Sequence, residues 1–353
     1  MSEKRTVEIV DVKLHQPIGL LRLVTDTGIE GHCLGIRSDE GPMIVEHLKE
    51  LVIGESPHFR EKIWNAMVER VRSDRLGAPV WAKIDVALWD LFGKTVEFPV
   101  FRLTGGFRDA VPVCKDGTTH APGDAAREAK RAIEEGFRAY RVRLGPEIRE
   151  AIETATAVRD SVGPDVPLCA ECSSTYEHVG ALKIGRALDE LEFRWIEDPF
   201  PSSDTQGLRA LAEELDTPVF STITGTEALS VGTQLLSAQA VDGLRVIPPQ
   251  SGGITDCLKL AHIAESFGAH CEIGVTGGFE AFVAAQLVGA VKNSTFFTPP
   301  DTSARDTREE KGYEGVIKNL PAISDGRLQI QKGIGLGLEL DWDEVERRTE
   351  TVS

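Results

Sequence analysis

Two hydrophobic patterns divide the chain. The first part opens with short alternating or wholly apolar runs, typical of antiparallel strands, at residues 7–12, 20–25 and 31–36. Apolar side chains that recur every three to four positions then predict helices at residues 42–52, 59–71 and 79–95. Because strands and helices do not alternate here, we predict a separate α+β domain over residues 1–109.

From residue 110 the pattern changes to short apolar runs separated by amphipathic stretches. Eight runs are strand candidates, at residues 111–114, 139–144, 167–171, 193–199, 218–227, 243–247, 270–273 and 295–298. Eight strands alternating with helices are typical of a TIM barrel. We therefore predict an α/β fold with a modified (β/α)7-8 barrel over residues 110–320. Residues 301–312 are polar and are expected to form a loop. Residues 321–353, with a turn and strand at 333–341, should return to the first domain.

Three neighbouring strand candidates each deliver one carboxylate at or near their ends, at Glu171, Glu197 and Glu227. The carboxyl ends of consecutive parallel strands in a barrel meet on one face. Three carboxylates meeting there would form an oxygen-rich site suited to Mg²⁺. Any one of them could instead cap or solvate a loop, but three in register favour the metal site.

Composition narrows the function. The chain has 353 residues, of which 41% are hydrophobic, and a formal net charge of −17. Such a charge argues against binding to nucleic acid or to an anionic membrane, which needs clustered Lys and Arg. We see no signal-peptide core and no apolar run of membrane-spanning length. Cys169 and Cys172 have CxxC spacing, but they fall in a predicted strand without a second pair, so six reduced thiols and a cytoplasmic location are expected.

Five motifs, in order, give the chain a family resemblance. They are AKIDVALWDLFGK at 82–94, PVFRLTGG at 99–106, WIEDP at 195–199, SGGITDCLK at 251–259 and GLGLELD at 335–341. The chain resembles the enolase superfamily, on the side of mandelate racemase and muconate lactonizing enzyme. The resemblance implies a capping domain over a modified barrel. It also implies that the proteins form symmetric assemblies, so a homo-oligomer is expected.

The resemblance also implies a chemistry. Carried over by position, the Mg²⁺ ligands are Glu171, Glu197 and Glu227. Glu171 stands where the family usually has Asp, and Glu227 requires one inserted residue in the family's Gly-Glu motif. The implied reaction removes the proton α to the carboxylate of a small hydroxy acid, while the metal stabilises the enediolate. A lyase or isomerase of the acid-sugar dehydratase or racemase type follows.

The sequence departs from the family at the positions of the base. Where the family has Lys-x-Lys, this chain has Arg141 and Arg143, which share one strand face because they are two residues apart. Arginine stays protonated, so it can hold a carboxylate or stabilise an oxyanion but is a poor general base. The usual base positions after strands six and seven correspond to Ile247 and Gly274, which do not titrate.

Lys115 is the best alternative base, because a lysine in a dry pocket beside cations could have a lowered pKa. Other candidates, each of which could equally be structural or solvated, are His15, Asp116, His120, Glu272 and His178, the last of which lies close to Tyr176. Two functions stay open. One is an Mg²⁺-dependent enzyme that uses Arg141 and Arg143 as electrophiles. The other is a family member that binds metal or an anion without the usual proton abstraction.

Overall fold

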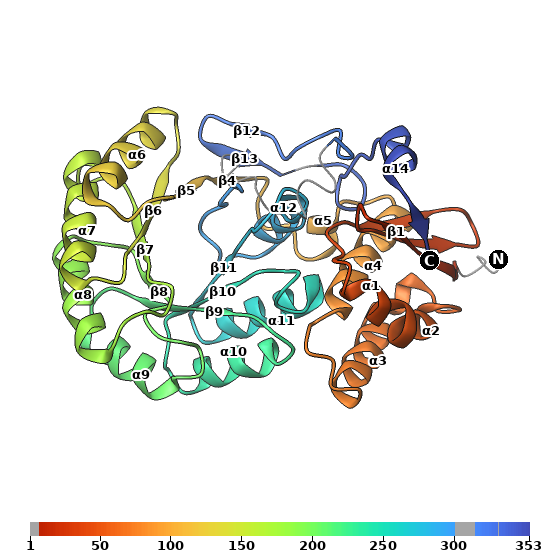
Figure 1. The fold of residues 1–353 in the computed structure, drawn as a ribbon, viewed down its shortest axis with the longest axis horizontal. Helices are drawn as coiled ribbons and strands as arrows, with labels where there is room; N and C mark the ends of the chain where they lie inside the picture. The colour runs from red at the N-terminus through yellow and green to blue at the C-terminus, as the bar shows by residue number, and fades with distance from the viewer. Residues whose placement is uncertain (1–6, 301–314, 331) are drawn as a thin grey trace.

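A computed structural model describes residues 7–300, 315–330 and 332–353 of the chain. Figure 1 shows a curled sheet ringed by helices beside a smaller body that holds both the first and the last described strands. The smaller body contains a four-stranded sheet in the order β14-β1-β2-β3, and the curled sheet has seven strands. This arrangement confirms the predicted barrel fold with a capping domain.

The capping sheet is antiparallel. Its strands are β1 (Ile9–Gln16), β2 (Leu20–Thr25), β3 (Glu30–Cys33) and β14 (Thr351–Val352). Its helices include α3 (Arg60–Ser73) and α4 (Trp81–Thr95), with the short η2 (Pro57–Phe59) and α5 (Val100–Leu103). The single helix predicted at 42–52 is instead α1 (Glu40–Met43), a π-helical turn η1 (Ile44–Leu48) and α2 (Lys49–Val52).

The seven barrel strands are all parallel and lie in chain order, as expected for consecutive βα units. They are β5 (Cys114–Asp116), β6 (Ala139–Arg143), β7 (Leu168–Glu171), β8 (Ile196–Glu197), β9 (Val219–Ile223), β10 (Gly243–Val246) and β11 (His270–Ile273). The helices are α6 (Pro122–Glu134), α7 (Ile148–Val162), α8 (His178–Glu190), α9 (Thr205–Glu214), α10 (Ala228–Ser237), α11 (Gly253–Ser266) and α12 (Glu280–Ala290).

The eighth strand candidate, at residues 295–298, forms only an isolated bridge between Phe297 and Val113. Phe297 N–H donates to the Pro112 carbonyl, and Cys114 N–H donates to the Phe297 carbonyl. On its other side, the segment donates the Thr295 and Phe296 N–H groups to the buried Glu272 carboxylate. A side chain therefore replaces the ladder that a strand would make with β11.

Alternate residues of the strands fill the barrel in layers, because successive side chains of a strand point to opposite faces. The lower layer is a separate apolar cluster of Cys114, Ala139, Cys169, Trp195, Phe220 and Phe296. Trp195 stacks on Phe220 with ring centroids 4.9 Å apart. All six cysteines are buried and free. The residues two positions further along the strands lie above this apolar floor.

The predicted strand at 333–341 is wrong, because this segment forms turns with isolated bridges at Gly335 and Leu340. Gly335 has φ +68°, and a Cβ there would lie 2.3 Å from Asp90 Oδ1. Only glycine permits so close an approach. Further along, β12 (Ile323–Ser324) pairs with β13 (Arg327–Gln329), and β13 pairs with β4 (Ala110–Pro112) at the start of the barrel, while β14 joins the capping sheet.

Helices α4 and α11 join the two bodies through buried polar contacts. Asp85 accepts hydrogen bonds from the N–H and hydroxyl of Thr255, at 2.9 and 2.5 Å. Trp89 Nε1 donates to the same hydroxyl at 2.9 Å, and Trp81 Nε1 donates to Asp256 at 3.3 Å. Burial raises the pKa of Asp85 to about 6, and burial together with the Asp85 charge raises the pKa of Asp256 to about 7.

This junction predicts that the fold loses stability as the pH rises. Between about pH 4 and 7, the folded chain holds protons on Asp85 and Asp256 that the unfolded chain has released, so the free energy of unfolding falls across this window. For Asp85 alone, the change is about 3 kcal/mol. Denaturant unfolding measured at several pH values should show it.

Asp85→Asn should remove part of this pH dependence, because the amide does not titrate in this range. Asp160→Asn, at an exposed position of α7, is the matched control and should leave the slope unchanged. Equal slopes in wild-type protein and the Asp85→Asn variant would contradict the prediction.

Candidate functional site

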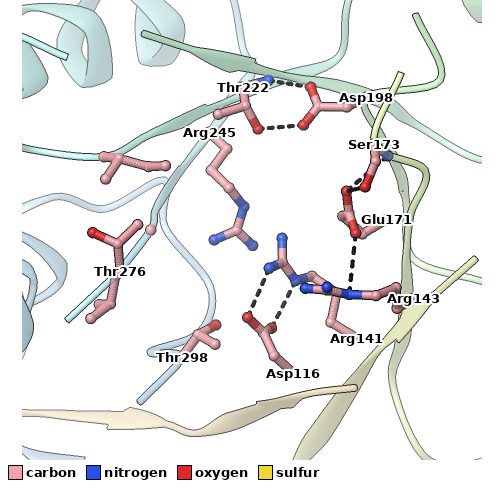
Figure 2. Close-up of a pocket in the computed structure, with 13 residues that line it drawn as sticks. Asp116, Arg141, Arg143, Glu171, Ser173, Asp198, Thr222, Arg245, Thr276 and Thr298 are labelled. Atoms are coloured by element: carbon pink, nitrogen blue, oxygen red, sulfur yellow. Dashed lines mark hydrogen bonds and ion pairs between the residues drawn. The ribbon is translucent and has the colours of Figure 1, made fainter. Parts of the chain in front are cut away.

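A cavity of about 300 Å³ opens at the carboxyl ends of the barrel strands, within the size range of small-molecule sites. Its lining is mostly polar. It consists of Asp116, Arg141, Arg143, Glu171, Ser173, Asp198, Thr222, Arg245, Ile247, Gly274, Val275, Thr276 and Thr298. Figure 2 shows the guanidinium groups of Arg141 and Arg245 pointing into the middle of this ring. Among the residues that the structure describes, three arginines and no lysine or histidine line the cavity.

Glu197 lies beneath this cavity, is fully buried, and accepts hydrogen bonds from three side chains. Arg245 donates from Nε to Oε2 at 3.0 Å and from Nη2 to Oε1 at 2.8 Å. Arg141 Nη1 donates to Oε2, and Trp195 Nε1 donates to Oε1 at 2.7 Å. Each carboxylate oxygen of Glu197 therefore has two donors.

The charges in this cluster hold one another ionised. Burial alone would raise the pKa of Glu197, but Arg141 and Arg245 outweigh it and lower that pKa to about 2. Burial would likewise lower the pKa of Arg141, but Asp116 and Glu197 raise it well above its ordinary value. Arg141 donates to both oxygens of Asp116, at 2.7 and 2.8 Å. A buried ion pair of this kind needs such complete pairing.

Arg245 is a site residue that the sequence analysis missed. It lies in β10, where all four residues are buried, and its position in the sheet is level with Thr222 of β9 and Glu272 of β11. The analysis assigned the site position on this strand to Ile247, which also lines the cavity. An arginine between apolar neighbours in a buried strand was the available signal, because a buried guanidinium requires an anion.

Arg143 reaches the cavity from the same strand face as Arg141, as their spacing predicts. Its side chain is 51% exposed, and its nearest anion is Glu171, with Nε 3.8 Å from Oε2. The other oxygen of Glu171 accepts from the N–H and hydroxyl of Ser173, at 2.8 and 2.7 Å. Figure 2 shows these contacts along one wall. Arg143 is thus the cavity's most loosely paired cation.

Asp198 follows β8 and faces the cavity. Its two oxygens accept from the N–H and the hydroxyl of Thr222, both at 2.6 Å. Burial raises the pKa of Asp198, although these hydrogen bonds oppose the rise. Asp198 and Ser173 both have left-handed backbone conformations, with φ +49° and +51°. Backbone strain of this kind gathers at functional sites, because the surrounding structure must hold it.

The structure does not bring two predicted residues to the cavity. Glu227 precedes α10, its side chain is 55% exposed, and its nearest cation is Arg72, 3.4 Å away. Strand β9 instead contributes Thr222, because the chain turns at Gly225 before Glu227 is reached. Lys115 lies between Cys114 and Asp116, whose side chains face the barrel interior, so Lys115 points to the opposite face of β5.

Of the other candidate bases, only Asp116 lines the cavity. His15 contacts Arg22 and Thr349 in the capping domain. His178 stacks on Phe200 and lies 3.2 Å from Asp204. Glu272 accepts hydrogen bonds from the segment at 295–298, and the His120 ring lies beside Gly145, whose carbonyl accepts from Tyr176.

The donors at the cavity do not fit a Mg²⁺ ion, which needs near-octahedral oxygen coordination. Both oxygens of Glu197 are held by arginines and Trp195, and Glu227 lies elsewhere. Within residues 7–300, 315–330 and 332–353, no group of three Asp, Glu, His or Cys is placed to hold a metal ion. The predicted triad of Glu171, Glu197 and Glu227 is therefore not assembled.

Two family models match the chain: the N-terminal domain of mandelate racemase / muconate lactonizing enzyme at residues 7–105, and the enolase C-terminal domain-like model at 124–345. The chain belongs to the mandelate racemase / muconate lactonizing enzyme family. This membership confirms the predicted family and its place in the enolase superfamily. None of the helices in the described part of this family member is long and apolar enough to cross a membrane.

Relatives of this family member have known activities. It is 27% identical to the N-succinyl-L-Arg/Lys racemase of Bacillus cereus, covering 94% of this chain and 90% of the racemase. It is 26% identical to the D-xylonate dehydratase of Haloferax volcanii, covering 97% and 89%. The crystal structure of D-glucarate dehydratase from Agrobacterium tumefaciens, complexed with magnesium, matches with a TM-score of 0.83, 26% identity and 98% of both chains covered.

Loss of Arg245 should destabilise the fold. Arg245→Met leaves part of a fully buried carboxylate unpaired, and breaking such a pair costs about 3–5 kcal/mol. Arg143→Met removes the same charge from a half-exposed position and should cost about 1 kcal/mol or less. Denaturant unfolding of both variants tests the contrast, and similar losses in the two would contradict the central role of the Glu197 pairs.

Proposed function

We propose that this protein is a lyase or isomerase that acts on a small hydroxy carboxylate by removing the proton α to the carboxyl group. The observation that carries the proposal is the ring of three arginines around a small polar cavity at the carboxyl ends of the barrel strands. Active sites of TIM-barrel enzymes lie at this end. Relatives that are dehydratases, racemases and cycloisomerases of acids support the reaction class.

The arginines supply binding and charge stabilisation. Arg143 is half exposed and loosely paired, so its guanidinium can bind a substrate carboxylate. Two parallel N–H donors of a guanidinium match the two oxygens of a carboxylate. Thr276 and Thr298 line the opposite wall and can donate to substrate hydroxyls. Arg141 and Arg245 then face the carboxylate as negative charge develops on it. Mg²⁺, which the resemblance implies, has no part in this proposal, because its ligands are engaged.

Glu171 is the lining carboxylate best placed to accept the α-proton. Its Oε2 has only the Arg143 Nε at 3.8 Å, whereas both oxygens of Asp116 and both of Asp198 already accept hydrogen bonds. A base must have an oxygen within reach of the proton it removes. In this scheme Ser173 holds the other oxygen of Glu171 and fixes the side chain toward the cavity.

A second function is favoured by one observation. The acidic side chains of the cavity are nearly all paired, and its lining holds no lysine or histidine in the described part of the chain. The same ring of arginines could bind a small carboxylate without removing its proton. Binding and proton exchange therefore have to be measured separately.

The proposal predicts solvent exchange at the α-carbon. Incubation in D₂O with a library of aldonic and aldaric acids should place deuterium at the α-carbon of at least one acid, detected by mass spectrometry and NMR. Binding by calorimetry without exchange would favour the second function. If no acid binds and none exchanges, either with EDTA or with millimolar Mg²⁺, both proposed functions are wrong.

Variants assign the roles. Glu171→Gln should keep the affinity for the acid and slow exchange by about a hundredfold or more, because a general base contributes at least that much. Arg143→Met should weaken binding by about tenfold to a hundredfold, the worth of a hydrogen bond to a charged group. Arg149→Met, at a side chain that is 92% exposed on α7, is the control and should change neither.

A further inference from the structure

Two arginines of the cavity lie where they could take the place of a metal ion such as the magnesium of the related D-glucarate dehydratase structure. Arg141 and Arg245 line the cavity, and Glu197, to which both donate, does not. Two guanidinium groups therefore separate the most buried carboxylate of the site from the space that a ligand would enter. They come from β6 and β10, each separated from β8 by one strand, so the order of the sheet places them on opposite sides of Glu197.

The other carboxylate oxygens at the cavity provide few ligands for a hard cation such as Mg²⁺. Asp116 is held by Arg141, Asp198 by Thr222, and one oxygen of Glu171 by Ser173. Among the carboxylates that line the cavity, Glu171 Oε2 alone has no hydrogen bond within the described part of the chain. A single oxygen beside three arginines is a poor start for a site that needs several oxygen ligands and negative charge.

We propose that the guanidinium groups of Arg141 and Arg245 occupy the place of a divalent cation, so that the barrel mouth of this protein binds none. The positive charge that a metal would present to a substrate anion is built into the chain. Arginine suits this use because it is permanently charged, planar and less strongly hydrated than an ammonium group. The inference concerns cation binding alone and stands or falls independently of the reaction proposed above.

Direct metal binding tests it without any substrate. Protein stripped with EDTA would be titrated with Mn²⁺, a paramagnetic substitute for Mg²⁺, and free ion followed by electron paramagnetic resonance. Crystals grown with Mn²⁺ would locate any bound ion by anomalous scattering. We expect no ion at Glu171 or Glu197. One Mn²⁺ per chain coordinated by either residue would overturn the proposal.

A charge-matched pair of variants tests the reverse. Arg141→Met/Arg245→Met frees the oxygens of Glu197, and should bind Mn²⁺ at least tenfold more tightly than the wild type. Arg149→Met/Arg186→Met removes the same charge from exposed positions of α7 and α8, and should not. Equal affinities in the two folded double variants would contradict the replacement. If the first variant does not fold, as circular dichroism would show, the wild-type titration and map decide the question.

Discussion

The buried charge of Glu197 is the constraint on which the barrel mouth depends. A carboxylate fully removed from water is costly unless it is paired and hydrogen-bonded. Here Arg141 of β6 and Arg245 of β10 reach it from opposite sides, each across one intervening strand, and Trp195 reaches it from the apolar layer below. Once these partners are in place, the position of each guanidinium is set by the sheet. Two of the three arginines that line the cavity are thus placed by their ion pairs with Glu197.

The same constraint extends to the neighbouring Asp116, which is held by Arg141. Arg141 serves two carboxylates, Glu197 below and Asp116 beside it, so its charge is shared along the wall. Arg143, two residues further along β6, lies beyond the reach of both and remains half exposed. The two inward-facing positions of β6 thus place Arg141 deep in the cavity, against Glu197, and Arg143 at its rim. We expect Arg141 to stabilise the fold through these pairs, and Arg143 to be available to a ligand.

Much of the fold could be predicted from the sequence, because it follows from local pattern. The period of the apolar residues indicated the barrel strands, and the spacing of Arg141 and Arg143 placed both on one face. Glu227 failed because counting along the chain cannot show where β9 ends; the turn at Gly225 carries this residue out of the site. Arg245 was missed because the family's base position on this strand corresponds to Ile247, two residues further along. Pairings between distant strands decide the site, and no local pattern reports them.

The balance of charge gives the last step. Like charges repel strongly at short range: a divalent ion about 4 Å from one guanidinium costs about 8 kcal/mol at an effective dielectric constant of about 20. A cation at this mouth would meet Arg141, Arg143 and Arg245 together, while an anion would meet the same groups as attraction. Asp116, Asp198 and Glu197 oppose this preference with their own charges, but their oxygens already accept hydrogen bonds from the arginines or from Thr222, and Glu171 keeps a single oxygen without one. This pairing is why we propose an anionic ligand, held by side chains whose charge does not depend on a bound ion.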